Sequence, residues 1–228
     1  MTRSSVKPDA QKLLCQIRAE GSDEWLAKMA GFGIETSRAV GVSVTRLRQL
    51  RRGMARDNAA AFELWNSGVH EARLLATTLF EPDELERKDV ERLVCALDSW
   101  DICDMACNEV FRKVPFAVEL PWEWAERSEE YVRRAGYALV ATFALRGMEF
   151  DYASFFSAIR LGASDERKMV HKAVNWSLRQ IGKRSDELWG KAVECARELS
   201  HSDGRSARWV GRNAIWQLSS PKWRPVCA

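Results

Sequence analysis

Two segments of this chain carry one pattern, and the pattern is helical. VHKAVNWSL (170–178) and VGRNAIWQL (210–218) share Val, a basic residue, Trp and Leu at identical positions. VRRAGYAL (132–139) and VHEARLLA (69–76) begin with the same Val. Apolar residues recur at spacings of three and four, whereas the alternation that is typical of strands never persists. The sequence therefore predicts an all-α protein.

The breaks between these segments indicate the size of the repeat. Clusters of Gly, Pro, Ser and Asp, such as those at 66–68, 162–166 and 201–204, divide the chain into about a dozen helices. The Val-led segments are predicted to be the second helices of hairpins that recur about every 31 to 40 residues, as in HEAT and armadillo repeats. We expect one HEAT-like α-solenoid domain over residues 1–228, with about six hairpins, a concave face lined by second helices, and a flexible N-terminus over residues 1–10.

The distribution of charge is more informative than its sum. A net charge of +3, from 35 basic and 32 acidic residues, does not by itself indicate a nucleic-acid binder. The segment TRLRQLRRGMAR (45–56) contains five arginines and no acidic residue: Arg46, Arg48, Arg51, Arg52 and Arg56. Such a segment suits a surface that faces phosphates, and it equally suits a solvated helix face. Both interpretations stay open at this point.

Metals, cofactors and membranes are not indicated. The six cysteines include no CxxC pair and only three histidines could join them, so we expect no metal site and no organic cofactor. The thiols are expected to pack as small apolar groups. No apolar run reaches the length of about 18 residues that a membrane span needs, and the first thirty residues lack the pattern of a secretion signal. We therefore expect a monomeric, cytoplasmic protein.

Cations and tryptophans share a register in the last three repeats. Arg134, Lys172 and Arg212 each stand two residues after the leading Val. Because residues i and i+4 share a helix face, Lys172 is expected beside Trp176, and Arg212 has the same relation to Trp216. A cation next to an indole suits a phosphate and the neighbouring sugar or base. Alternatively, the indoles fill the core between hairpins while the cations extend past them to water.

The segment LDSWDICDMAC (97–107) places two carboxylates near a tryptophan. Asp101 falls in the first turn of a predicted helix, where the helix dipole favours a carboxylate. Asp104 falls in the second turn on the same face as Trp100, and the start of the helix does not explain it. Asp104 is either paired with an arginine in the core or exposed in a groove, where it could stabilise a developing positive charge.

An aspartate beside an indole suits the cleavage of a glycosidic bond. The transition state resembles an oxocarbenium ion, which a carboxylate stabilises. The electron-rich face of an indole attracts cationic groups such as an alkylated base or the charged sugar. A leaving group that is already cationic needs no general acid, so one carboxylate suffices. Trp100, Asp104 and Trp176 on adjacent concave helices would form such a site.

The chain also resembles the AlkD-like DNA alkylation repair proteins. The resemblance is carried by four segments: SWDICD (99–104), VHKAVNWSLRQIGKR (170–184), LWNSGVHEARLLAT (64–77) and KMAGFGIETSRAVGVSVTRLRQL (28–50). It implies a HEAT-like solenoid that wraps duplex DNA, and a glycosylase that excises cationic N3- and N7-alkylated purines. It further implies that the damaged base stays stacked while the protein contacts the deoxyribose.

The resemblance assigns roles to individual residues. The catalytic Asp of the family corresponds to Asp104, and its two sugar-contacting tryptophans correspond to Trp100 and Trp176. Its phosphate-binding Arg falls at VRR (132–134). Within that segment Arg134 is preferred over Arg133, because Arg134 holds the register of Lys172.

Further DNA contacts are expected at Lys172, Arg179 and Arg212. One segment departs from the family: GFGI (31–34) stands where an aromatic and proline-containing loop is common, so contact with the strand opposite the lesion is not predicted there.

The leading interpretation is a monofunctional DNA glycosylase that acts on double-stranded DNA containing alkylated bases. The motif contains no lysine that could form a Schiff base, so strand cleavage is not expected. Two alternatives stay open. One is a non-catalytic HEAT-repeat protein that binds DNA structures, and the other is a protein-binding HEAT scaffold whose tryptophans anchor a peptide.

Overall fold

The structure is a computed structural model that describes residues 6–220. Within this range the chain forms α-helices and two short 3₁₀ helices, and no β-strand. The chain divides into two compact units: the described residues up to Val90 with Asp98–Pro115 form unit 1, and Glu91–Leu97 with the described residues from Phe116 onward form unit 2. The predicted all-α class is confirmed.

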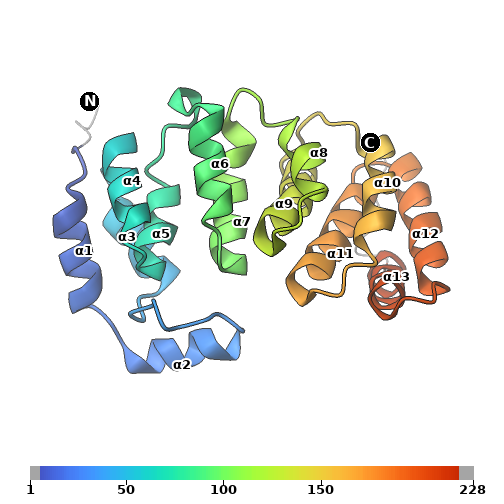
Figure 1. Cartoon of the computed structure of the whole chain (residues 1–228), viewed down its shortest axis with the longest axis horizontal. Coiled ribbons are helices and arrows are strands. Elements are labelled where there is room, and N and C mark those ends of the chain that lie inside the picture. The colour runs from blue at the N-terminus through green and yellow to red at the C-terminus, as the bar shows by residue number, and fades with distance from the viewer. Residues whose placement is uncertain (1–5, 221–228) are drawn as a thin grey trace. The chain divides into compact units, whose positions relative to one another are not determined.

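Unit 1 is organised around α5. Its elements are α1 (Ala10–Ala19), α2 (Asp23–Gly31), α3 (Val44–Arg51), α4 (Asn58–Asn66), α5 (His70–Thr77), η1 (Pro82–Glu84), the first turn of α6 (Arg87–Cys95), α7 (Trp100–Glu109) and η2 (Phe111–Lys113). α5 packs against α1, α3, α4 and α7, and α2 runs crosswise to α1 (Figure 1). The core is filled by fully buried side chains, among them Ile17, Leu64, Leu75, Leu79 and Phe80.

Side-chain caps define where several of these helices begin. Asp9, Ser22, Ser43 and Asp57 each accept a hydrogen bond from the backbone N–H three residues further on. A cap of this kind is worth about 1 kcal/mol, because it satisfies an N–H group that lacks a partner within the helix. The starts of α1, α2, α3 and α4 therefore follow from the local sequence.

The predicted flexible N-terminus over residues 1–10 lies partly outside the described residues. In the described part, Val6 donates its N–H to the carbonyl of Gly53 at 2.8 Å and accepts a hydrogen bond from Ala55 at 2.9 Å. Asp9 then caps α1 through Lys12 N–H at 3.0 Å. These hydrogen bonds connect residues 6–9 to the loop after α3 and to the start of α1.

A buried carboxylate fixes the loop between α2 and α3. Glu71 on α5 is fully buried. Its Oε1 accepts hydrogen bonds from the backbone N–H groups of Val40, Gly41 and Val42 at 3.2, 2.7 and 3.2 Å, and its Oε2 accepts one from Val40 at 3.0 Å. Gly41 has a φ of +86°, a conformation that favours glycine. The loop therefore depends on a residue of α5 for its backbone hydrogen bonds.

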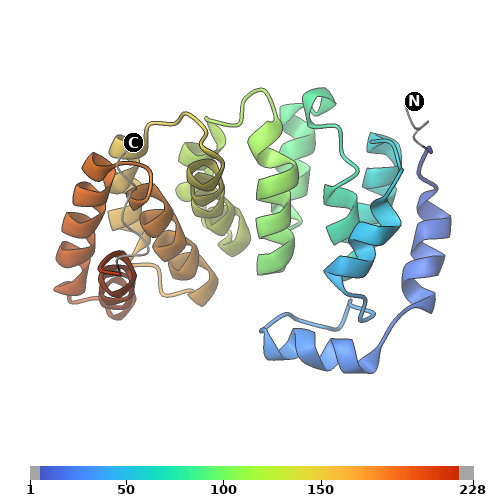
Figure 2. The ribbon, with the colours of Figure 1, turned by 180° about the vertical axis from the view of Figure 1, so that it is seen from behind.

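Unit 2 contains the longer helices. Its elements are the rest of α6, then α8 (Leu120–Ala125), α9 (Glu130–Arg146), α10 (Tyr152–Gly162), α11 (Lys168–Gly182), α12 (Asp186–Ser200) and α13 (Arg205–Leu218). α9 packs between α8 and α11, and α13 packs against α11 and α12, which it adjoins in both views (Figures 1 and 2). α9 ends at Gly147, whose φ of +71° forms a left-handed cap. The largest fully buried side chains here are Trp124, Tyr137, Phe143 and Phe155.

The Val-led segments predicted as second helices fall on α5, α9, α11 and α13. Most predicted breaks coincide with helix ends, for example at Asn66, Gly162 and Ser200. The segment LPW (120–122) also lies at a helix boundary, because Leu120 begins α8. Pro121 stands in the first turn of that helix, where a proline loses no hydrogen bond and its fixed φ is favourable.

Gly211 allows α13 to approach α12 closely. A Cβ atom there would lie 2.5 Å from the carbonyl oxygen of Ala196 and would also collide with the backbone of Ser200. Gly211→Ala should therefore lower the free energy of unfolding by about 1–3 kcal/mol in urea denaturation. At exposed Gly190 on α12 a Cβ would meet nothing within 4 Å, so Gly190→Ala should raise it by up to about 1 kcal/mol. Effects of the same sign would contradict this account of the packing.

Candidate functional site

Trp100 and Asp104 lie one turn apart at the start of α7. Ser99 occupies the N-cap position, so Trp100 is the first helical residue. The residues that α7 buries are Ile102, Cys103, Ala106 and Cys107. Trp100 and Asp104 are only half-buried. The two side chains proposed from the sequence thus share a partly accessible side of one helix.

Asp101, next to this pair, is engaged in structure. Its Oδ2 lies 2.9 Å from His70 Nε2, and its Oδ1 accepts hydrogen bonds from Ser99 Oγ at 2.5 Å and from Ile102 N–H at 3.0 Å. Burial acts to raise the pKa of Asp101, but the hydrogen bond and charge of His70 outweigh it and leave this pKa below its ordinary value. The first-turn role predicted for Asp101 agrees with the Ile102 contact. The pairing with His70 was not predicted.

The lowered pKa of Asp101 makes the stability of the protein depend on pH in the acidic range. When the pH falls toward the ordinary carboxyl pKa of 3.8, Asp101 binds a proton in the unfolded chain but stays ionised in the folded protein. The free energy of unfolding should therefore fall. This contribution is fully present above about pH 5. Denaturation curves between pH 3 and pH 6 should show a weaker pH dependence for Asp101→Asn than for the wild type. Asp83→Asn, at an exposed residue, should keep the wild-type slope.

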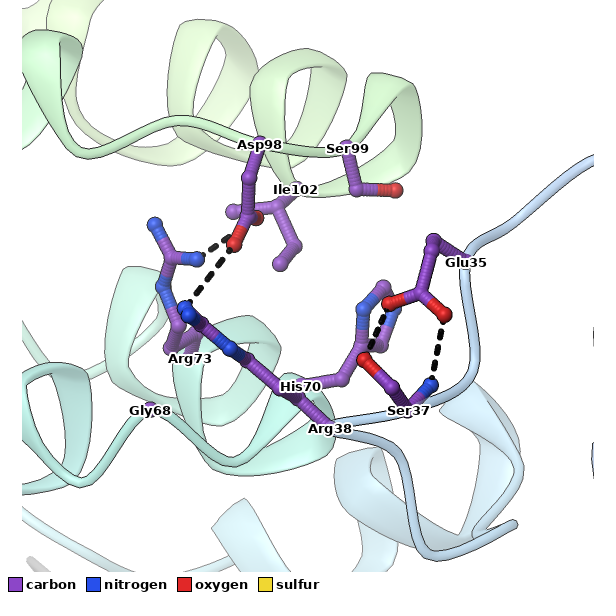
Figure 3. Close-up of a pocket in the computed structure, with 9 residues that line it drawn as sticks. All are labelled: Glu35, Ser37, Arg38, Gly68, His70, Arg73, Asp98, Ser99 and Ile102. Carbon is purple, nitrogen blue, oxygen red and sulfur yellow. Dashed lines mark hydrogen bonds and ion pairs between the residues drawn. The ribbon is translucent and has the colours of Figure 1, made fainter.

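A cavity of about 290 Å³ opens at the start of α7 (Figure 3). Its lining residues come from the loop before α3, the start of α5 and the start of α7: Glu35, Ser37, Arg38, Gly68, His70, Arg73, Asp98, Ser99 and Ile102. Arg38 and Arg73 both point at Asp98, at 3.6 and 2.6 Å, from two different elements. The cavity thus carries charges of both signs, and the two arginines share one carboxylate.

Arg73 holds its charge almost out of contact with water. The side chain is 4% exposed, and its guanidinium lies 4.4 Å from the ring centroid of Trp65. Burial lowers the pKa of Arg73, and the charge of Asp98 opposes that effect. An arginine, unlike a lysine, stays protonated in such a position and stacks on an indole. Sequence reasoning missed this group, because Arg73 and Asp98 are 25 residues apart.

In unit 2, the residues predicted to contact DNA differ in accessibility. Lys172 on α11 and Arg212 on α13 are exposed, and Trp176 is half-buried one turn after Lys172. Arg179 is half-buried, and its guanidinium donates to the carbonyl of Asn175 at 3.2 Å and to the side chain of Gln217. Lys172 and Arg212 therefore point to solvent, whereas Arg179 already has protein acceptors.

Arg134 does not have the exposure expected of a phosphate contact. It is 5% exposed, and its Nη1 donates to the carbonyl of Met169 at 2.7 Å. The neighbouring Arg133 is half-buried and lies 3.5 Å from Asp165. The register that Arg134 shares with Lys172 predicts an outward-pointing side chain. Instead, α9 buries Arg134 against α11, and a buried guanidinium is poorly placed to contact DNA.

The basic segment 45–56 is also more engaged than its sequence indicated. Arg46 forms two hydrogen bonds of 2.7 Å with Glu20, an acidic residue outside the segment. Arg51 donates to the backbone carbonyls of Thr78 and Met54, and Arg56 to that of Phe80. Within this segment Arg48 and Arg52 are exposed. These two are the candidates left here for a phosphate-facing surface.

The cysteines divide into two groups. Cys103, Cys107 and Cys195 are buried as predicted, whereas Cys15 and Cys95 are exposed, and Cys227 lies outside the described residues. Burial raises the pKa of the Cys195 thiol to about 11, so it stays protonated. In the described part of the chain, no three His, Cys, Asp or Glu side chains form a group that could hold a metal ion. No helix between residues 6 and 220 is long and apolar enough to cross a bilayer.

The fold is similar to that of HEAT-like repeat proteins of known structure. One belongs to a family described as related to the HEAT-like repeat DNA glycosylases with affinity for branched DNA structures. It matches with a TM-score of 0.73 over 92% of this chain and 96% of that chain, at 15% sequence identity. Two designed armadillo repeat proteins, one in complex with the peptide (KR)4, match at 16% identity over 93% of this chain and 95% of theirs, with TM-scores of 0.42 and 0.37.

The sequence then identifies the family. Residues 13–218 match the profile of the DNA alkylation repair enzymes, and the chain belongs to this family. The resemblance drawn from the four sequence segments is thereby confirmed. No curated protein matches the chain.

Proposed function

We propose that this protein is a monofunctional DNA glycosylase. It would hydrolyse the N-glycosidic bond of cationic alkylated purines, of the 3-methyladenine and 7-methylguanine type, in double-stranded DNA. The observation that carries the proposal is the pair of Trp100 and Asp104, one turn apart and half-buried on α7, in a chain of the DNA alkylation repair family. No metal or organic cofactor enters the proposal.

Asp104 is proposed to act on the deoxyribose. As the bond between C1′ and the base nitrogen breaks, its electron pair leaves with the base, which departs neutral because alkylation had made it cationic. The sugar gains positive charge, which the Asp104 carboxylate stabilises. A water oriented by the same carboxylate attacks C1′ and gives its proton to that carboxylate, which then releases it to solvent. Trp100 is proposed to contact the sugar with its ring face, and the resemblance to the family assigns the same role to Trp176.

Exposed cations are proposed to bind the DNA backbone. Lys172 and Arg212 are exposed in unit 2, and Arg48 and Arg52 are exposed in unit 1. Each phosphate that such a residue neutralises releases counterions, so affinity for DNA should fall steeply as salt rises. Arg179 is also proposed to bind a phosphate, which would compete with its hydrogen bonds to Asn175 and Gln217. Arg134 is not proposed as a phosphate contact, because it is buried.

A second candidate function is recognition of branched DNA without catalysis. It is favoured by the similarity in fold to the structure described as having affinity for branched DNA structures. In that case the cations would bind phosphates, and Asp104 would have no chemical role.

One assay set distinguishes these functions. The full-length protein is incubated with duplex DNA that carries 7-methylguanine, and the released base is measured by chromatography. Binding to a four-way junction and to an undamaged duplex is measured at low and at high salt. Base release supports the glycosylase. Tight junction binding without release supports the second candidate, and no salt-dependent DNA binding overturns both and favours a protein-binding scaffold.

Three further predictions rest on the sequence: a single functional domain, a monomer and a cytoplasmic location. Sedimentation of the purified protein tests the second of these, with a mass of 26.0 kDa expected.

A further inference from the structure

A cavity in unit 2 has features that the proposed chemistry does not use. It has a volume of about 500 Å³, which is within the usual range for ligand sites. It is lined by residues from the starts of α11 and α13: Glu166, Lys168, His171, Lys172, Arg205, Ser206 and Trp209. Of these, only Lys172 was predicted from the sequence to contact DNA.

The cavity is positively charged. Lys168, Lys172 and Arg205 are exposed, and none of them forms an ion pair with any residue that the structure describes. One acidic residue, Glu166, also lines the cavity, so three cations face one carboxylate. Lys168 and Arg205 are the first residues of α11 and α13, and neither helix has a side-chain cap. The positive ends of two helices of 15 and 14 residues therefore add to the charge of the side chains.

An aromatic surface lies beside these cations. Trp209 is 40% exposed, unusually open for a tryptophan, and its ring centroid is 5.1 Å from that of His171. Burial lowers the pKa of His171 and outweighs the hydrogen bond and charge of Asp165, which act to raise it, so the ring is mainly neutral at pH 7. A neutral imidazole and an exposed indole offer flat faces on which an unpaired base can stack.

We propose that this cavity binds one nucleotide unit, with a phosphate held by Lys168, Lys172 and Arg205 and an unpaired base stacked on Trp209. The occupant is a nucleotide in a single-stranded stretch of DNA or a free nucleotide, because both offer the same phosphate and base. A base inside a duplex has both faces covered by its neighbours, so it cannot stack on Trp209. The inference goes beyond the proposed function, with which it shares only Lys172.

The test uses the full-length protein and fluorescence anisotropy with a labelled pentathymidylate, alongside the same strand with abasic central positions. The wild type should bind the thymidylate about 10-fold more tightly than the abasic strand, because each stacked base adds to the affinity. Trp209→Leu should bind both strands equally. The double variant Lys168→Gln, Arg205→Gln should bind both more weakly. Trp25→Leu, the same change at a tryptophan in unit 1, should behave as the wild type.

Equal binding of the two strands by the wild type would overturn the proposal, and so would an unchanged preference in Trp209→Leu. Competition by thymidine monophosphate distinguishes a free nucleotide from a nucleotide of a DNA strand as the occupant. If the monophosphate displaces the labelled strand at concentrations near the Kd of that strand, the occupant is a free nucleotide. If displacement needs far higher concentrations, the occupant is a DNA strand. Trp209→Leu should release 7-methylguanine at the wild-type rate, which would show that the cavity and the glycosylase site are independent. If the protein releases no base at all, the strand-binding measurement still tests the cavity.

Discussion

The Asp104→Asn variant should release 7-methylguanine from duplex DNA at least about 100-fold more slowly than the wild type, with its affinity for that duplex unchanged. Asparagine has nearly the same size and shape as aspartate, so the start of α7 is preserved. The amide carries no negative charge, so it cannot stabilise the oxocarbenium-like sugar. The rate is measured in single turnovers with protein in excess, because product release then does not contribute.

Asp83→Asn is the matched control for this measurement. Asp83 is an exposed aspartate of η1 in the same unit, and this variant should release base at the wild-type rate. A wild-type rate in Asp104→Asn would remove Asp104 from the chemistry. A parallel loss of DNA affinity in that variant would show that Asp104 acts on binding or on the structure of the unit.

The largest effect on stability is expected at Glu71. Glu71→Gln should lower the free energy of unfolding by about 3 kcal/mol, measured by urea denaturation. The carboxylate is fully buried and accepts backbone hydrogen bonds from Val40, Gly41 and Val42. An amide offers one oxygen, and when that oxygen takes the place of Oε1 the N–H₂ group faces the N–H of Val40, so two buried donors oppose each other.

Glu24→Gln provides the comparison for Glu71. Glu24 also lies on a helix of unit 1, but its side chain is 79% exposed and pairs only with Lys28. Such a surface change should alter the unfolding free energy by less than about 0.5 kcal/mol. Equal and small effects of the two substitutions would show that the buried hydrogen bonds of Glu71 contribute nothing net to stability.

Several helices could be predicted because their ends carry a local signal. Ser185 and Asp151 cap α12 and α10 through N–H groups three residues away, and Gly147 ends α9 in a left-handed conformation. The family is recognisable for a similar reason, since its motifs are short and contiguous. Trp100 and Asp104 are likewise neighbours on one helix, so their proximity follows from their spacing in the sequence.

The charged contacts could not be predicted, because their partners are far apart along the chain. His70 meets Asp101 over 31 residues, and Arg46 meets Glu20 over 26. A charged residue on a helix is normally solvated, and nothing in its immediate sequence shows that a distant carboxylate is adjacent. Arg134 illustrates the same limit. Its register matches that of Lys172, yet packing of α9 against α11 buries it.

The position of Glu71 also bears on how the chain acquires its structure during synthesis. Gly41 leaves the ribosome 30 residues before the carboxylate that holds it. Until α5 is complete, the N–H groups of residues 40–42 have only water as acceptors, so α2 and the loop after it lack a fixed position on the growing chain. We therefore expect the first helices to become resistant to proteases only once translation has passed Thr77.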